Sequence, residues 1–159
     1  MPTLNWETAR HEFDRDGSLR DLYAFETSDV DWDRFLRALR GWGFPVQFSI
    51  DGAPSEMPES ARSAFEIRAQ AAPLLVVDIG GIRLCCHFFT DEQLELDLDP
   101  SEVDSPSRLE CLTAFMRRLG QALQRTVVLT PENCPESPFI RYDPRSNEAS
   151  YHPSLEGAA

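Results

Sequence analysis

The chain has 159 residues, 42% of them hydrophobic, so it is long enough to bury one core as a single domain. Its 27 acidic and 15 basic residues leave a net charge of −12, which argues against nucleic acid and anionic lipid as partners, because both demand a positive surface. No apolar run is long enough to span a membrane, and the N-terminus lacks a signal-peptide pattern, so we expect a cytoplasmic protein without membrane association.

The basic and sulfur-containing residues narrow the chemistry further. All 15 basic residues are arginines, which is typical of a GC-rich bacterial genome, and the absence of lysine excludes mechanisms that need a Schiff-base or P-loop lysine. The four cysteines, Cys85, Cys86, Cys111 and Cys134, show no CxxC spacing. We therefore expect reduced thiols, with Cys86 and Cys111 buried as small apolar side chains.

The first part of the chain predicts a short helix over 4–14, a strand over 19–25 and a longer helix over 29–41. Ser28 and Asp31 have the spacing of a capping box at the start of the longer helix. The apolar residues of that helix recur at three- and four-residue steps and form one stripe: Trp32, Phe35, Leu36, Leu39 and Trp42.

The middle of the chain reads mainly as strands. Apolar and polar residues alternate over 44–50, and an Asp51-Gly52 turn follows. The stretch 59–70 fits either a short helix or a strand. Strands over 74–79, 82–89 and 94–98 are joined by short connections, so we expect an antiparallel meander over about 74–99.

The last third begins with a predicted helix over 106–124, capped by Ser105 with Pro106 in the first helical position. Short strands are expected at 127–129 and 139–142, joined by a proline-rich loop over 130–138. We expect one domain over 1–145 and a polar, frayed tail over 146–159. The fold class that follows is α+β: one mainly antiparallel sheet, with helices 29–41 and 106–124 packed on one face to cover their apolar stripes.

The meander predicts a polar strip on the sheet face away from the core. A three-residue turn at 90–92 places the apolar residues of both strands on one face, and a one-residue slip would mix leucines with polar side chains. The other face then pairs His87 with Glu95, Cys85 with Asp97 and Arg83 with Asp99. This strip is interpreted as a solvated face with cross-strand ion pairs. The alternative is a small enzyme or metal-binding domain that uses Cys85, His87, Glu95 and Asp97, with Cys85, His87 and Asp97 as the metal ligands.

Function is predicted from charge, since none of the motifs GxGxxG, Walker A, HExxH or GxSxG occurs. We expect an acidic binding protein for a basic protein partner, without catalysis, cofactor or metal. Immunity proteins that neutralise basic toxin nucleases, and adaptors, are examples of such small acidic domains. A charge of −12 would steer a cationic partner toward the protein. The candidate contacts are acidic residues at one helix start and along one strand: Asp29, Asp31, Asp33, Asp91, Glu92, Glu95, Asp97 and Asp99.

Overall fold

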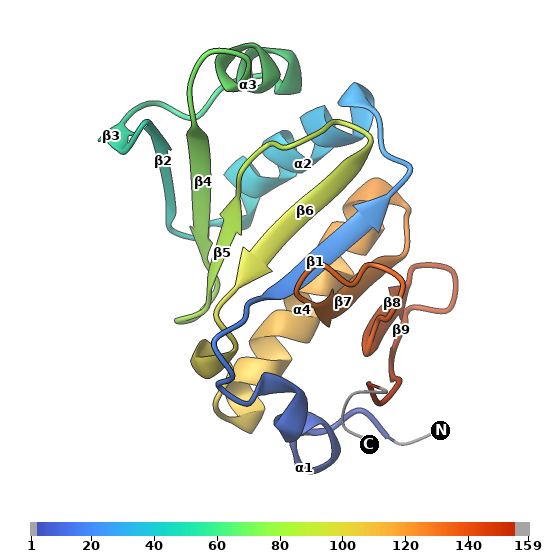
Figure 1. Cartoon of the computed structure of the whole chain (residues 1–159). Helices are drawn as coiled ribbons and strands as arrows, with labels where there is room; N and C mark the ends of the chain where they lie inside the picture. Colours follow the sequence, from blue (N-terminus) through green and yellow to red (C-terminus); the bar gives the residue numbers. More distant parts are fainter. Residues whose placement is uncertain (1–2, 155–159) are drawn as a thin grey trace.

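Nine strands pair antiparallel in one sheet in the computed structural model, which describes residues 3–154 (Figure 1). The order across the sheet is β3-β2-β4-β5-β6-β1-β7-β8-β9. In chain order the strands are β1 (Arg20–Phe25), β2 (Val46–Ile50), β3 (Ala53–Pro54), β4 (Pro73–Asp78), β5 (Arg83–Cys86), β6 (Gln93–Leu98), β7 (Val127–Pro131), β8 (Ile140–Asp143) and β9 (Glu148–Tyr151). The α+β class with an antiparallel sheet is therefore confirmed.

Four α-helices are present in residues 3–154, together with 3-10 turns at Arg10–Phe13 and Pro100–Glu102: α1 (Trp6–Ala9), α2 (Asp29–Trp42), α3 (Ala61–Arg68) and α4 (Pro106–Leu123). The two longest, α2 and α4, lie on the same face of the sheet, as the sequence predicts (Figure 1). None of these helices is long and apolar enough to cross a membrane.

The ends of α2 and α4 follow from their flanking residues. The Ser28 backbone N–H donates to the Asp31 carboxylate at 3.0 Å, which is one half of a capping box, and α2 ends at Gly43 with a φ of 81°. The Ser105 hydroxyl accepts a hydrogen bond from the backbone N–H of Arg108 at 3.2 Å, and Pro106 opens α4. The apolar stripes of both helices are buried against the sheet.

The predicted register of the meander is confirmed, since Cys85 pairs with Asp97 and Arg83 with Asp78. The apolar residues of β5 and β6 accordingly face α2 and α4 and are buried. β5 ends at Cys86 rather than at the predicted residue 89, because Phe88 has a φ of 56°, which lies outside the strand region. The stretch 59–70, left open between helix and strand, contains α3.

The prediction of a frayed tail over 146–159 is wrong for its first half. Residues Glu148–Tyr151 form β9, which pairs with β8. Tyr151 is buried, and its hydroxyl donates a hydrogen bond to Glu12 at 2.9 Å. Tyr151 is the only residue of β9 that is buried, so the sequence of this edge strand shows no apolar alternation. Residues 155–159 lie outside the described residues.

The predicted burial of two cysteines is right for Cys86 and wrong for Cys111. Cys86 is fully buried, and burial raises its pKa to about 12. Cys111 is half-buried instead of buried, because it lies at the edge of the core, where its sulfur packs against Gly80.

Candidate functional site

The face of the sheet opposite α2 and α4 is here called the open face (Figure 1). The residues of β5 and β6 that alternate with the buried apolar ones lie on this face. The segment 132–138, here called the proline loop, crosses this face over β1 and β7. It is anchored at two points: the Glu132 carboxylate accepts the Leu19 backbone N–H at 2.6 Å, and the Asn133 backbone N–H donates to Asp21 at 2.8 Å. An acidic cluster lies on the β5 and β6 side of the open face, and a pocket lies on the β7 and β8 side.

The acidic cluster consists of Asp21, Tyr23, His87, Glu95 and Asp97. Strand pairing brings it together, because Asp21 is opposite Asp97 and Tyr23 is opposite Glu95 across β1 and β6. The Tyr23 hydroxyl is 3.2 Å from the Asp21 carboxylate and 3.4 Å from that of Glu95. Asp21 and Tyr23 are buried, whereas Glu95 and Asp97 are half-buried. Three carboxylates therefore share a small area that water reaches only in part.

Burial raises the pKa of each of these three carboxylates. Neighbouring carboxylates add to the effect: Glu132 raises the pKa of Asp21, and Asp21 raises the pKa of both Glu95 and Asp97. His87 and the hydrogen bonds within the cluster act in the opposite direction but are weaker than burial. The ionised cluster is therefore under mutual repulsion in the folded protein.

His87 contacts a different carboxylate from the one predicted. Its Nε2 lies 3.1 Å from the Asp97 carboxylate. His87 follows the end of β5 at Cys86, so no strand pairing sets it opposite Glu95. The His87 ring stacks on Phe89 with 5.1 Å between centroids, and the Arg68 guanidinium lies over the Phe89 ring at 5.5 Å from its centroid. The predicted partner of His87 is wrong, although the strand register behind the prediction is right.

The predicted pair of Arg83 and Asp99 does not form either. Arg83 pairs with Glu102 at 3.3 Å, while Asp99 accepts the backbone N–H of Ser101 and caps the 3-10 turn that follows β6. The 3-10 turn after β6 therefore supplies the partners of both Arg83 and Asp99. No pattern in the sequence predicts this turn.

The three aspartates of α2 have separate positions. Asp29 is exposed. Asp31 is buried, where it completes the capping box and pairs with Arg125 at 3.1 Å. Asp33 accepts the backbone N–H of Ala61 at 2.7 Å at the start of α3. Two of these carboxylates are thus engaged within the chain, whereas Asp91, Glu92 and Asp99 are exposed at the two ends of β6.

The chemistry of Cys85 bears on the alternative of an enzyme or a metal site. Burial and the neighbouring carboxylate of Asp97 raise the pKa of the Cys85 thiol, which disfavours the thiolate that a nucleophile or a metal ligand requires. In residues 3–154, no group of three His, Cys, Asp or Glu side chains is arranged to hold a metal ion.

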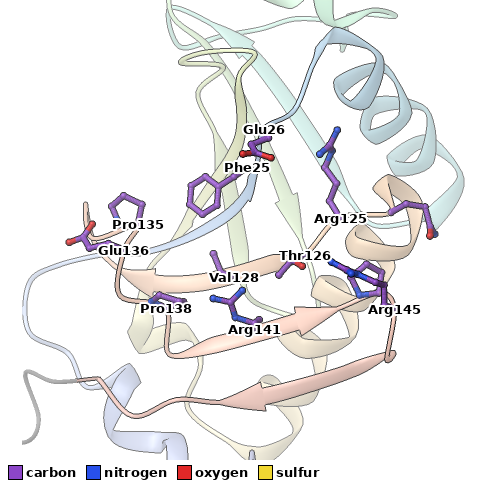
Figure 2. Close-up of a pocket in the computed structure, with 12 residues that line it drawn as sticks. Phe25, Glu26, Arg125, Thr126, Val128, Pro135, Glu136, Pro138, Arg141 and Arg145 are labelled. Carbon is purple, nitrogen blue, oxygen red and sulfur yellow. The ribbon is translucent and has the colours of Figure 1, made fainter.

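The pocket on the other side of the proline loop has a volume of about 520 Å³. Figure 2 shows Phe25, Val128 and Arg141 projecting into it from β1, β7 and β8, with Pro135 and Pro138 on one side and Arg145 on the other. Arg125 also lines it, although Asp31 holds that guanidinium. This pocket was not predicted, because its residues come from four separate segments.

Comparisons with protein families, characterised proteins and solved structures find nothing that matches this chain. Its function is therefore inferred from its side chains.

Glu95→Gln is expected to raise the free energy of unfolding at pH 7 by under about 1 kcal/mol, because Glu95 is half-exposed and the repulsion is partly screened. The folded state raises the Glu95 pKa above its ordinary value of 4.5, so the protonated form is favoured by folding. That stabilisation is complete below pH 4.5 and is lost as the pH rises through the folded pKa. Urea unfolding at pH 4 and pH 7 should therefore show the gain at pH 7 alone.

The exposed Glu59, outside the cluster, provides the control. Glu59→Gln should leave stability unchanged at both pH values. A loss of stability in Glu95→Gln at pH 7 would mean that the carboxylate of Glu95 is held by favourable contacts rather than strained by its neighbours.

Proposed function

We propose that this protein is a non-catalytic binding protein that holds a basic segment of a protein partner against the acidic cluster. The observation that supports this most strongly is the imbalance of charge in the cluster. Asp21, Glu95 and Asp97 lie together, and within residues 3–154 the only salt bridge to any of them is that of His87. A guanidinium or ammonium group from a partner would supply the missing positive charge and relieve the repulsion.

The surroundings of the cluster suit a basic side chain. Phe89 contacts His87 and Arg68 but is still 56% exposed, so the exposed part of its ring can cover the apolar stem of an arginine or lysine. The exposed carboxylates of Asp91, Glu92 and Asp99 extend the negative charge along β6. A net charge of −12 would increase the rate of encounter with a cationic partner. An immunity-protein-like or adaptor role is consistent with these properties.

The proposal predicts specific loss of affinity for a defined probe, an end-blocked hexapeptide of arginine. Glu95→Gln combined with Asp97→Asn should weaken its binding at least tenfold in about 0.15 M salt, where screening over about 8 Å suppresses remote charges. Isothermal titration calorimetry measures the affinity, and NMR shifts of the Cys85 and Phe89 amides locate the site.

The matched control is Asp104→Asn combined with Glu59→Gln, which removes the same two charges from exposed positions outside the cluster. It should change the affinity less than twofold. Equal losses in the two double variants would show that net charge alone attracts the peptide, and the proposal would fail. Thermal unfolding of each variant checks that the fold is retained.

A further inference from the structure

The pocket beside the proline loop differs in chemistry from the acidic cluster. Its lining includes three arginines, which come from three places: the second residue after α4, β8 and the turn after β8. Arg125 is neutralised by Asp31 at 3.1 Å. Arg141 and Arg145 are exposed, and neither forms an ion pair with any residue in 3–154. Two guanidinium groups that form no ion pair therefore face one cavity.

The charge of the lining favours a monoanion. Glu26 and Glu136 also line the pocket, and Figure 2 shows the Glu136 carboxylate directed away from Arg141 and Arg145. Arg125 is already paired with Asp31. The positive charges of the two remaining arginines are balanced, at longer range, by the negative charges of these two glutamates. The two glutamates would repel a dianion such as a phosphate monoester about twice as strongly as they repel a carboxylate. A carboxylate has two oxygens, which can accept hydrogen bonds from two guanidinium groups at once.

The remaining walls are apolar. Phe25 is half-buried, and its ring is held by stacking on Tyr23 with 5.0 Å between centroids. Val128 pairs with Arg141 across β7 and β8, so an apolar surface lies directly beside a guanidinium. Pro135 and Pro138 form the opposite wall, and both are rigid residues. The volume of about 520 Å³ is in the range of small-ligand sites.

We propose that this pocket binds a carboxylate attached to a flat apolar group. Arg141 and Arg145 hold the carboxylate, and Phe25 and Pro138 contact the apolar group. Either a free organic acid or the C-terminal residue of a polypeptide has this chemistry. The pocket adjoins the acidic cluster, because Phe25 stacks on Tyr23. The two ligands nevertheless have opposite charges, so the arginine-peptide experiment and the one below can fail separately.

The probes that test the site are N-acetyl-phenylalanine and its amide, which differ only in the carboxylate. We expect saturable binding of the acid, with NMR shifts at Phe25 and Val128, and at least tenfold weaker binding of the amide. Arg141→Gln and Arg145→Gln should each weaken binding of the acid about tenfold, because each removes a charge-assisted hydrogen bond to the carboxylate. Arg62→Gln, an exposed position on α3, removes the same charge and should have no effect.

A second arm assigns the source of the ligand, using acetyl-Gly-Gly-Phe with a free C-terminus. A gain in affinity over N-acetyl-phenylalanine indicates a polypeptide terminus, and no gain indicates a small organic acid. The proposal is overturned if the acid does not bind saturably, if the amide binds equally well, or if Arg141→Gln and Arg145→Gln bind as the unmodified protein does. Both substituted arginines are exposed, so the variants should fold, and thermal unfolding checks this.

Discussion

Gly120→Ala is expected to lower the free energy of unfolding by about 1–3 kcal/mol, the usual cost of overpacking a core. Gly120 lies inside α4, where alanine would ordinarily gain about 0.5–1 kcal/mol. An added Cβ would, however, lie 2.5 Å from two ring atoms of Tyr142 and 3.1 Å from the Arg125 carbonyl oxygen. Tyr142 is fully buried on β8 and has no room to move. Urea unfolding measures the change.

Gly41→Ala is the matched control, because Gly41 also lies within a helix, α2, and an added Cβ meets nothing within 4 Å. It should raise the free energy of unfolding by up to about 1 kcal/mol. The two glycine variants are thus expected to change stability in opposite directions. A stabilising Gly120→Ala would contradict the close packing of α4 on β8.

Trp32→Ala should cost about 3–5 kcal/mol, as is usual when a large buried aromatic is removed. Trp32 is 1% exposed, and its ring contacts Phe35, Phe65 and Phe88 at centroid distances of 6.2, 5.2 and 5.4 Å. Its Nε1–H donates to the Asp91 carbonyl oxygen at 3.1 Å. One side chain therefore joins α2, α3 and the β5–β6 connection. Chemical denaturation monitored by far-UV circular dichroism gives the loss.

Two further variants separate packing from hydrogen bonding at this site. Trp32→Phe keeps most of the buried surface, and the Asp91 carbonyl oxygen keeps its hydrogen bond from the Thr27 hydroxyl at 2.7 Å, so we expect a smaller loss than in Trp32→Ala. Trp42→Ala removes the other tryptophan of α2, which is only half-buried, and should also cost less. If Trp42→Ala proves as damaging as Trp32→Ala, the core is not centred where the structure places it.

Local patterns were enough to predict most of the elements of the fold. The stripe of α2, its capping box and the Ser105-Pro106 start of α4 are short-range features, and each is present in the structure. The meander register was also predictable, because six apolar residues have to share one face. β9 was missed, since a four-residue edge strand with only Tyr151 buried has no apolar alternation.

The candidate site depended on contacts that a sequence does not contain. Alternation within 20–25 places Asp21 and Tyr23 on one face, but nothing local indicates that β1 pairs with β6. The predicted pair of His87 and Glu95 followed from extending β5 beyond Cys86, where the strand ends. The arginine-lined pocket was missed because Arg141 and Arg145 meet Phe25 only after the sheet is assembled.

The position of β1 between β6 and β7 affects how this chain folds during its synthesis. Its two neighbours, β6 and β7, are synthesised long after it, so both edges of β1 stay unpaired while most of the chain emerges from the ribosome. Until then, Leu22 and Phe25 are exposed on a segment that can pair with other chains. Contacts between residues so distant in sequence also slow folding. The two segments must be brought together, at a cost in chain entropy, before their pairing stabilises the chain. Arg20 and Asp21 provide charges within this segment, which limits aggregation of the nascent chain.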